Sequence, residues 1–172
     1  MLRDRQKEKG QALVEFALTF FLFIFLVFGV IELGRFVFSI IAIRTAAREG
    51  ARFGSAAGGL ASGVDNYYED CDGIVAAATR IGNYAGLQDW DVEIFYDDGE
   101  VTPAIFDACD PNDPTNPMDD DPPNAEDINL GDRVVVTTSG TIVPLANFLP
   151  LPELTYSSTA RRTIVKDVII DD

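Results

Sequence analysis

Residues 16–31 read FALTFFLFIFLVFGVI, and Thr19 supplies the only polar side chain in this run. Residues 12–14 add three apolar positions, so the stretch approaches the roughly 20 residues that a helix needs to cross a bilayer core. Basic residues precede it (Arg3, Arg5, Lys7 and Lys9), and Lys and Arg beside a membrane span stay on the cytoplasmic side. We therefore expect a transmembrane part at about residues 12–33, with the N-terminus in the cytoplasm and the remainder exported.

Two other interpretations of the apolar run stay open at this point. A cleaved secretory signal peptide also begins with basic residues and an apolar core. However, this run is long for a signal core and continues into Glu32-Leu33-Gly34-Arg35 without an Ala-x-Ala site. A single uncleaved membrane anchor is the stronger alternative.

The helix is expected to continue beyond the membrane. Residues 36–43 (FVFSIIAI) are again apolar, and the chain contains no proline before Pro103. This pattern predicts one continuous helix over residues 11–54, about 65 Å long at 1.5 Å per residue. About half of that helix would stand outside a bilayer.

Two stripes with a spacing of four residues follow the outer half of this helix. One stripe consists of small residues (Ala42, Ala46, Gly50 and Gly54) and the other of arginines (Arg44, Arg48 and Arg52). A small-residue face allows close backbone approach, by the chain's own domain or by another subunit. Like charges at this spacing cost about 0.2–0.5 kcal/mol. The arginines are therefore expected to face an acidic partner surface or, alternatively, solvent and lipid headgroups.

The rest of the chain is strongly acidic. Residues 53–172 hold 23 Asp and Glu against five Arg and Lys, a formal balance of −18. Nucleic acid is excluded as a partner, because phosphate contacts require clustered Lys and Arg. The charge is densest in residues 107–127, DACDPNDPTNPMDDDPPNAED. Five prolines and few apolar residues predict a loop there.

This acidic loop contains candidate calcium ligands. Calcium takes several carboxylate, amide and carbonyl oxygens, and such oxygens are offered by Asp110, Asn112, Asp113, Asp119, Asp120 and Asp121. The loop lacks the sixth-position glycine and terminal glutamate of an EF-hand. No cofactor is therefore expected, and a calcium site remains the alternative to a solvated loop.

Residues 55–172 are expected to form one small extracytoplasmic domain. Its predicted elements are a helix at 74–87, a hairpin of strands 91–96 and 100–106 around a turn at 97–99, and strands at 133–140 and 157–170. The predicted fold class is α+β, a long N-terminal helix followed by a helix-plus-antiparallel-sheet domain. Cys71 and Cys109 would be joined by a disulfide in an exported domain, and two separate buried thiols are the alternative.

The sequence offers little support for catalysis. It contains no histidine, the commonest general base. Phosphate-binding and nucleophile-elbow patterns are also missing from it. We therefore expect a protein that is not an enzyme.

Glu15 lies just inside the apolar stretch, where a carboxylate is expensive, about 2.5–3.5 kcal/mol at the centre of a membrane helix. We expect a neighbouring subunit to offset this cost by supplying a positive partner for Glu15. The alternative is that Glu15 favours its own helix N-terminus and reaches the headgroups. Glu32 and Arg35 pose the same choice, either pairing on one helix face or marking the outer membrane interface.

Residues 10–18 (GQALVEFAL), 31–35 (IELGR) and 46–52 (AAREGAR) carry a resemblance to a known family. The first segment resembles the processing site of type IV pilin-like precursors. Together the three segments resemble the TadE-like family of minor pseudopilins, which belong to tight-adherence (Flp-type) pilus systems of bacteria. The resemblance covers residues 10–54 and is weak beyond them.

The resemblance implies a leader of residues 1–10, cleavage between Gly10 and Gln11 by a prepilin peptidase, and methylation of the new amine. It implies a minor pilin of the inner membrane that assembles or initiates a pilus with other pilin subunits, a secretion ATPase and an inner-membrane assembly platform. The residues expected to serve assembly are Glu15, Phe16, Glu32, Arg35, Arg44, Arg48 and Arg52. The alternative function is a single-pass anchored binding or adhesion domain, calcium-dependent, that never assembles.

Overall fold

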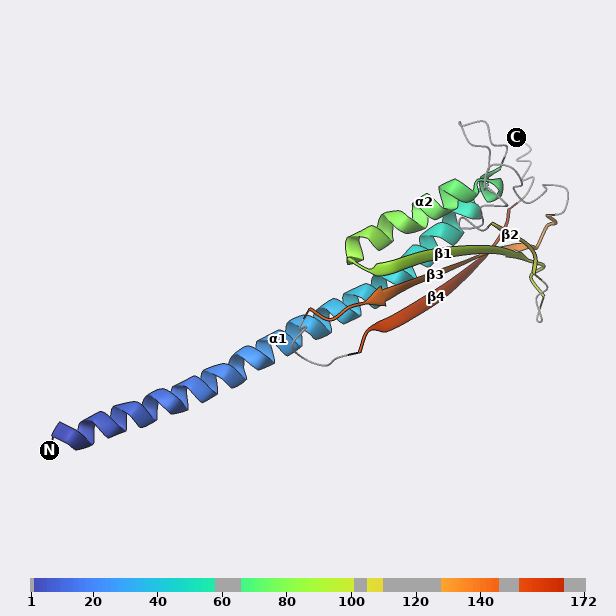
Figure 1. Cartoon of the computed structure of the whole chain (residues 1–172). Helices are drawn as coiled ribbons and strands as arrows, with labels where there is room; N and C mark the ends of the chain where they lie inside the picture. The colour runs from blue at the N-terminus through green and yellow to red at the C-terminus, as the bar shows by residue number, and fades with distance from the viewer. Residues whose placement is uncertain (1, 58–65, 101–104, 110–127, 146–151, 166–172) are drawn as a thin grey trace, which may run out of the picture. The chain divides into compact units, whose positions relative to one another are not determined.

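The computed structural model describes residues 2–57, 66–100, 105–109, 128–145 and 152–165. The chain divides into two compact units, Met1–Val37 and Phe38–Asp172. The first unit contains most of helix α1 (Leu2–Gly54), and the second contains the rest of α1 followed by a helix and an antiparallel sheet (Figure 1). The predicted α+β class is confirmed.

Helix α1 is continuous, as expected from a sequence without proline in this region. It ends at Gly54, the predicted last residue, and begins at Leu2, nine residues before the predicted start. Alanine, leucine, arginine, glutamate, lysine and glutamine, which favour helix, make up about half of its sequence. The segment resembling a pilin therefore lies entirely on one unbroken helix.

The second unit is built on a four-stranded antiparallel sheet with the order β2-β1-β3-β4. Its strands are β1 (Gln88–Asp97), β2 (Ile105–Cys109), β3 (Arg133–Ile142) and β4 (Leu154–Thr163). The predicted hairpin is confirmed, with Ile94 opposite Cys109. Gly99, at φ +74°, takes the left-handed conformation that the turn after β1 requires.

All four strands differ from their predicted bounds. Strand β1 runs from Gln88 to Asp97 instead of 91–96, and β4 ends at Thr163 instead of at residue 170. The second hairpin strand lies at Ile105–Cys109 instead of 100–106, so residues 107–109 belong to a strand and not to the acidic loop. Strand β3 runs two residues further than expected, and β4 begins at Leu154 instead of at residue 157. Pairing with β3 explains the early start of β4, because Leu154 lies opposite Ile142 in an uninterrupted register.

Helix α2 (Cys71–Gly82) begins three residues before its predicted start. Asp70 is its N-cap, and its side chain accepts a hydrogen bond from the Gly73 amide at 2.8 Å. This cap satisfies one of the amides that a helix start leaves unpaired. Helix α2 ends at Gly82, five residues before the predicted end, and is followed by a 3-10 turn, η2 (Asn83–Ala85), which Gly86 ends at φ +60°.

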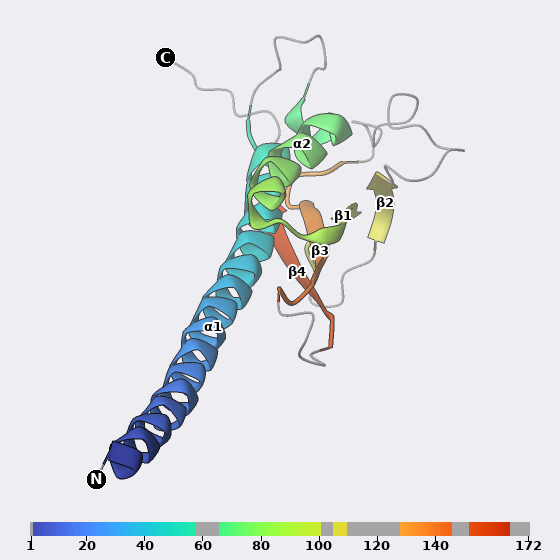
Figure 2. The same ribbon diagram turned by 60° about the vertical axis from the view of Figure 1, so that its left-hand side comes forward.

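Helix α2 and residues 38–54 of α1 cover one face of the sheet, as Figures 1 and 2 show. The core between them is formed by small helix residues and by branched or aromatic strand residues, including Ala51, Ile74, Ala78, Val92, Ile94, Tyr96, Val134 and Val136. Strand residues of one parity supply this face, which is the alternation expected of a half-buried sheet. The core also takes in Ile164, just beyond β4.

Candidate processing and assembly site

Gly10 lies within α1, in a position that the fold does not explain. A Cβ added at Gly10 would meet nothing within 4 Å, so packing does not require a glycine there. Glycine in a helix interior costs about 1 kcal/mol relative to alanine. The same is true of Gly29 and Gly34, which also have open space around them. Packing within the described residues therefore explains none of these three glycines.

The Glu15 carboxylate is engaged on its own helix. Gln11 Nε2 donates a hydrogen bond to Glu15 Oε1 at 3.2 Å, one turn away. Thr19 Oγ1 donates to the Glu15 carbonyl at 2.9 Å. Both hydrogen bonds lie at exposed positions, so they leave the second carboxylate oxygen within reach of a neighbouring molecule.

The apolar side chains around Glu15 are exposed. Phe16 is 69% exposed and stacks on Phe20 with ring centroids 5.8 Å apart. Large apolar side chains stay exposed along the helix as far as Ile41. A soluble monomer rarely exposes an apolar surface of this extent. By length and composition α1 can cross a membrane.

Glu32 and Arg35 form an ion pair on one helix face. Arg35 Nη2 lies 3.3 Å from Glu32 Oε1, and both side chains are about three-quarters buried. Pairing at a spacing of three residues is the first of the two alternatives considered for these charges. The apolar surface of α1 can therefore continue past this pair to Ile41.

The three arginines of the stripe differ in their contacts. Arg44 Nε donates to the Tyr156 hydroxyl at 2.8 Å, and its guanidinium lies 5.6 Å from the centre of the same ring. Arg52 forms an ion pair with Glu49 on its own helix. Arg48 is exposed and has no hydrogen bond or ion pair with the part of the chain that is described. The stripe is therefore only partly compensated within this molecule.

The Glu49–Arg52 pair affects the titration of both groups. The hydrogen bond from Arg52 is the main cause that lowers the pKa of the Glu49 carboxyl, and burial opposes it. The same hydrogen bond raises the pKa of Arg52. A lowered carboxyl pKa keeps Glu49 charged in the folded protein, so Arg52 is neutralised locally and is not available to another acidic group.

The small-residue stripe packs inside the chain's own domain. Ala42, Ala46, Gly50 and Gly54 are all buried. A Cβ at Gly50 would lie 3.0 Å from Val136 Cγ1 and 3.4 Å from Ala78 Cβ. Of the two alternatives considered for this stripe, the intramolecular one is found. The close approach of α1 to α2 and β3 depends on glycine at this position.

Gly50→Leu is expected to destabilise the domain by roughly 1–3 kcal/mol, because the added side chain overpacks the contact with Val136. The measurement is the thermal unfolding midpoint of the full chain in detergent. Arg48→Leu is the matched control, since its side chain is exposed on the same helix. A Gly50→Leu variant that melts like the parent would mean that this face is free for another subunit.

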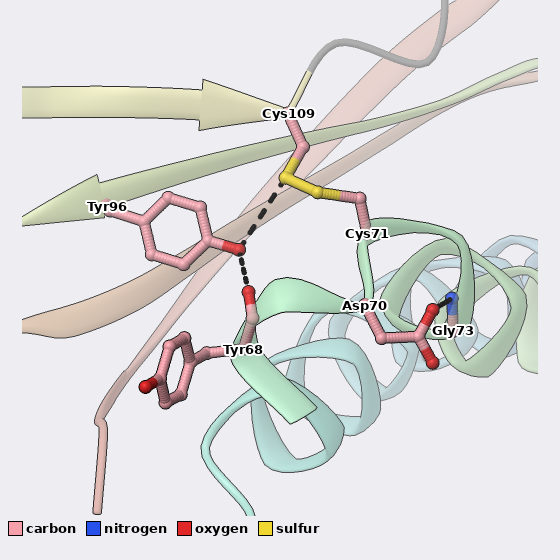
Figure 3. The surroundings of a disulfide bond; sticks show 6 residues. All are labelled: Tyr68, Asp70, Cys71, Gly73, Tyr96 and Cys109. Carbon is pink, nitrogen blue, oxygen red and sulfur yellow. Dashed lines mark hydrogen bonds between the residues drawn. A yellow bond between two sulfur atoms is a disulfide. The ribbon is translucent and has the colours of Figure 1, made fainter. Parts of the chain in front are cut away.

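Cys71 and Cys109 form the predicted disulfide, with their Cα atoms 6.1 Å apart. It joins the first residue of α2 to the last residue of β2 (Figure 3). The Tyr96 hydroxyl lies beside the disulfide. It donates a hydrogen bond to the Tyr68 carbonyl at 2.6 Å and lies 3.6 Å from Cys109 Sγ. The disulfide and Tyr96 together hold the edge strand β2 and the start of α2 against the core.

Some residues that hold this region together gave no signal in the sequence. Thr138, on β3, is fully buried, and its Oγ1 donates to the Ile43 carbonyl of α1 at 2.9 Å. The Tyr156 hydroxyl accepts a hydrogen bond from Arg44, which is 112 positions away in the chain. Both contacts depend on how strands pair and pack on α1. Local patterning does not reveal such long-range register.

The candidate calcium ligands, Asp110, Asn112, Asp113, Asp119, Asp120 and Asp121, lie outside the described residues. Within the described ranges, no group of three or more His, Cys, Asp or Glu side chains could hold a metal ion. The buried Asp97 is held instead by Arg133, whose Nε donates to Asp97 Oδ1 at 2.6 Å. That hydrogen bond raises the pKa of Arg133.

Comparison with known proteins gives a match over the N-terminal helix. The family model described as TadE-like protein matches residues 10–52. No curated protein and no solved structure matches the chain significantly. The matched segment begins at Gly10 and ends two residues before α1 does. It therefore contains the candidate processing site, the apolar surface and the arginine stripe, and none of the sheet.

Proposed function

We propose that this chain, which belongs to the TadE-like family through residues 10–52, is a minor pilin that takes part in assembling or initiating a tight-adherence, type IV-like pilus. The observation that carries the proposal is the juxtaposition on α1 of an unpacked glycine, a carboxylate one turn further on, and a long exposed apolar surface. A pilus system is the setting that the family implies. The specific subunit role is our proposal.

The proposed first step is removal of residues 1–10 by a prepilin peptidase. The open space around Gly10 supports this step, because a peptidase can approach a backbone that no side chain covers. Cleavage would leave a positive amine on Gln11 at the new helix start, open to methylation. Glu15 would then be the fifth residue of the mature chain.

The proposed second step is lateral association of apolar helices. The Gln11 amine and the Glu15 carboxylate are each expensive to bury alone, and pairing between neighbouring subunits offsets that cost. The free carboxylate oxygen of Glu15 supports such a contact. Phe16 and the apolar residues after it would pack against other pilin helices, with Glu32 paired to Arg35. Before assembly, α1 would anchor the chain in the inner membrane with its leader in the cytoplasm.

Gly10→Ala is expected to abolish removal of the leader when a prepilin peptidase is present, because a methyl group blocks the close approach of the peptidase to this bond. The measurement is the intact mass of the chain recovered from membranes, where the parent should lack residues 1–10. Gly29→Ala is the matched control, since Gly29 is also an unpacked helix glycine. An N-terminus at Met1 in the parent would contradict the proposed function.

A further inference from the structure

Strand β4 forms one edge of the sheet (Figures 1 and 2). It pairs with β3 over ten consecutive residues, from Leu154 opposite Ile142 to Thr163 opposite Arg133, with no bulge. On an edge strand, half of the backbone N–H and C=O groups point away from the sheet and are open to another strand. Residues 154–163 therefore offer a long, regular template for pairing.

The two edge strands of the sheet differ in length and in the regularity of their pairing. Strand β2, at the opposite edge, has five residues, and its pairing with β1 is interrupted by a register shift at Tyr96/Asp97. Natural proteins protect edges with short strands, bulges, proline or lysine. Strand β4 has twice that length and contains no proline or lysine between Leu154 and Thr163. Its only charged side chains are Arg161 and Arg162, so this edge is protected by positive charge alone, which opposes a basic strand and admits an acidic one.

A basic surface flanks this open edge. Arg44 donates to the Tyr156 hydroxyl, which places the arginine stripe of α1 on the side of β4. Ala160 packs against the core, so the side chains of β4 with even numbers face α1, and Arg162 is among them. The pKa of Glu49 is lowered mainly by the hydrogen bond from Arg52. The charge of Arg162 also lowers it, which agrees with a position of Arg162 beside that turn of α1.

Three of these arginines form no ion pair within the described ranges, although the charge of Arg162 acts on Glu49 at longer range. Arg44, Arg48 and Arg162 have no carboxylate partner within the described ranges of the chain, whereas Arg161 lies 3.7 Å from the carboxylate of Asp97. The chain as a whole carries a net charge of −15. We name Arg44, Arg48 and Arg162 the arginine surface. A basic surface without ion pairs on such an acidic protein favours an acidic partner.

We propose that the open edge of β4 binds an extended, acidic segment of another protein by strand addition, with the arginine surface engaging its carboxylates. Backbone hydrogen bonds to β4 would provide affinity, and the charges would set the choice of partner. This inference uses only the second unit. It stands whether or not the leader is removed or the helix enters a filament.

Two occupants from a second copy of this chain fit less well. If β4 paired with β4 of a second copy, the two arginine surfaces would be brought together, and like charges oppose association. Residues 110–127 are acidic, but Pro111, Pro114, Pro117, Pro122 and Pro123 remove the backbone donors that a paired strand needs. Charge and proline content therefore favour a segment of a different protein as the partner.

The test uses the full chain in detergent micelles and a labelled synthetic peptide as long as β4, alternating threonine or valine with glutamate. The expected result is binding, together with slower amide exchange in residues 154–163 and unchanged exchange in β2. The double variant Arg48→Glu/Arg162→Glu should weaken binding by roughly tenfold or more. It should also gain affinity for the same peptide with lysine in place of glutamate. Arg3→Glu/Arg5→Glu is the matched control, because both residues belong to the first unit and their reversal changes the net charge by the same amount.

A second probe separates strand addition from simple charge attraction. A glutamate peptide with alternate backbone amides N-methylated keeps its charge and loses its ladder donors, so its binding should be lost. Equal binding of the methylated peptide would overturn the proposal, as would unchanged exchange in β4 at saturating peptide. Binding to phosphatidylglycerol vesicles that needs Arg48 and Arg162, without peptide binding, would also overturn it and identify a lipid-facing surface.

Discussion

Replacing Cys71 and Cys109 together by serine is expected to lower the free energy of unfolding by about 4 kcal/mol. The disulfide closes a loop of 38 positions, and its loss restores conformational freedom to the unfolded chain. Domains of this size are stable by only about 5–15 kcal/mol, so the double variant would lose a large part of its stability. The two sulfur positions are also buried, at 3% and 5% exposure, where new hydroxyl groups are unfavourable.

The measurement is urea unfolding of the full chain, followed by the fluorescence of Trp90, the single tryptophan. Trp90 packs against the core and should report its loss. The matched control is the alanine pair Cys71→Ala/Cys109→Ala, which removes the cross-link without adding hydroxyl groups. Both pairs should fall close to the parent protein under reducing conditions. A reduced parent that unfolds at the same urea concentration as the oxidised protein would contradict this account.

Glu15→Ala is expected to leave removal of the leader intact and to reduce pilus assembly by a factor of 100 or more. Removing one partner from a buried charge pair costs about 3–5 kcal/mol, because the other charge stays buried alone. Here the charge left behind would be the Gln11 amine of a neighbouring subunit. The measurements are the mass of the mature chain and the number of surface pili seen by electron microscopy.

Thr19→Ala is the matched control for Glu15, since Thr19 lies one turn away on α1 and donates to the Glu15 carbonyl of its own helix, so its loss leaves no charge unpaired. It should impair assembly far less than Glu15→Ala. Glu15→Gln should behave like the alanine variant, because the amide keeps the size of the side chain and loses its charge. Normal assembly by Glu15→Gln would show that the hydrogen bond from Gln11 is the whole role of this side chain.

The continuity of α1 and its end at Gly54 were predictable because they depend on local chemistry, whereas its start at Leu2 was not predicted. A run of 53 residues without proline, rich in good helix formers, leaves few other conformations. The hairpin was also predictable, since alternation and the turn at residues 97–99 lie within one short segment. The disulfide followed from having two cysteines in a chain expected to be exported.

The bounds of β4 and the packing partner of the small-residue stripe were harder to predict from the sequence. Strand β4 is largely exposed, with only Tyr156, Ser158 and Ala160 partly buried, so its limits follow from pairing with β3 and leave little trace in its own hydropathy. Whether Gly50 met the chain's own domain or another subunit depended on the approach of Val136, which is 86 positions away in the chain. The predicted helix 74–87 begins too late because it does not use Asp70 as the N-cap, although an Asp before a helix is a recognisable signal.

The hydrogen bond from Thr138 to Ile43 spans 95 positions, and this separation sets an order of events during synthesis. Residues 38–54 emerge first, yet the strands that bury them arrive near the end of the chain. Folding dominated by such distant contacts is slow, because long loops must close before the contacts form. Apart from Ile43, the buried face of α1 consists of small residues, mainly alanine and glycine, so the nascent chain exposes little apolar surface there before the strands form. A newly made molecule can therefore remain open without a strong tendency to aggregate through this face.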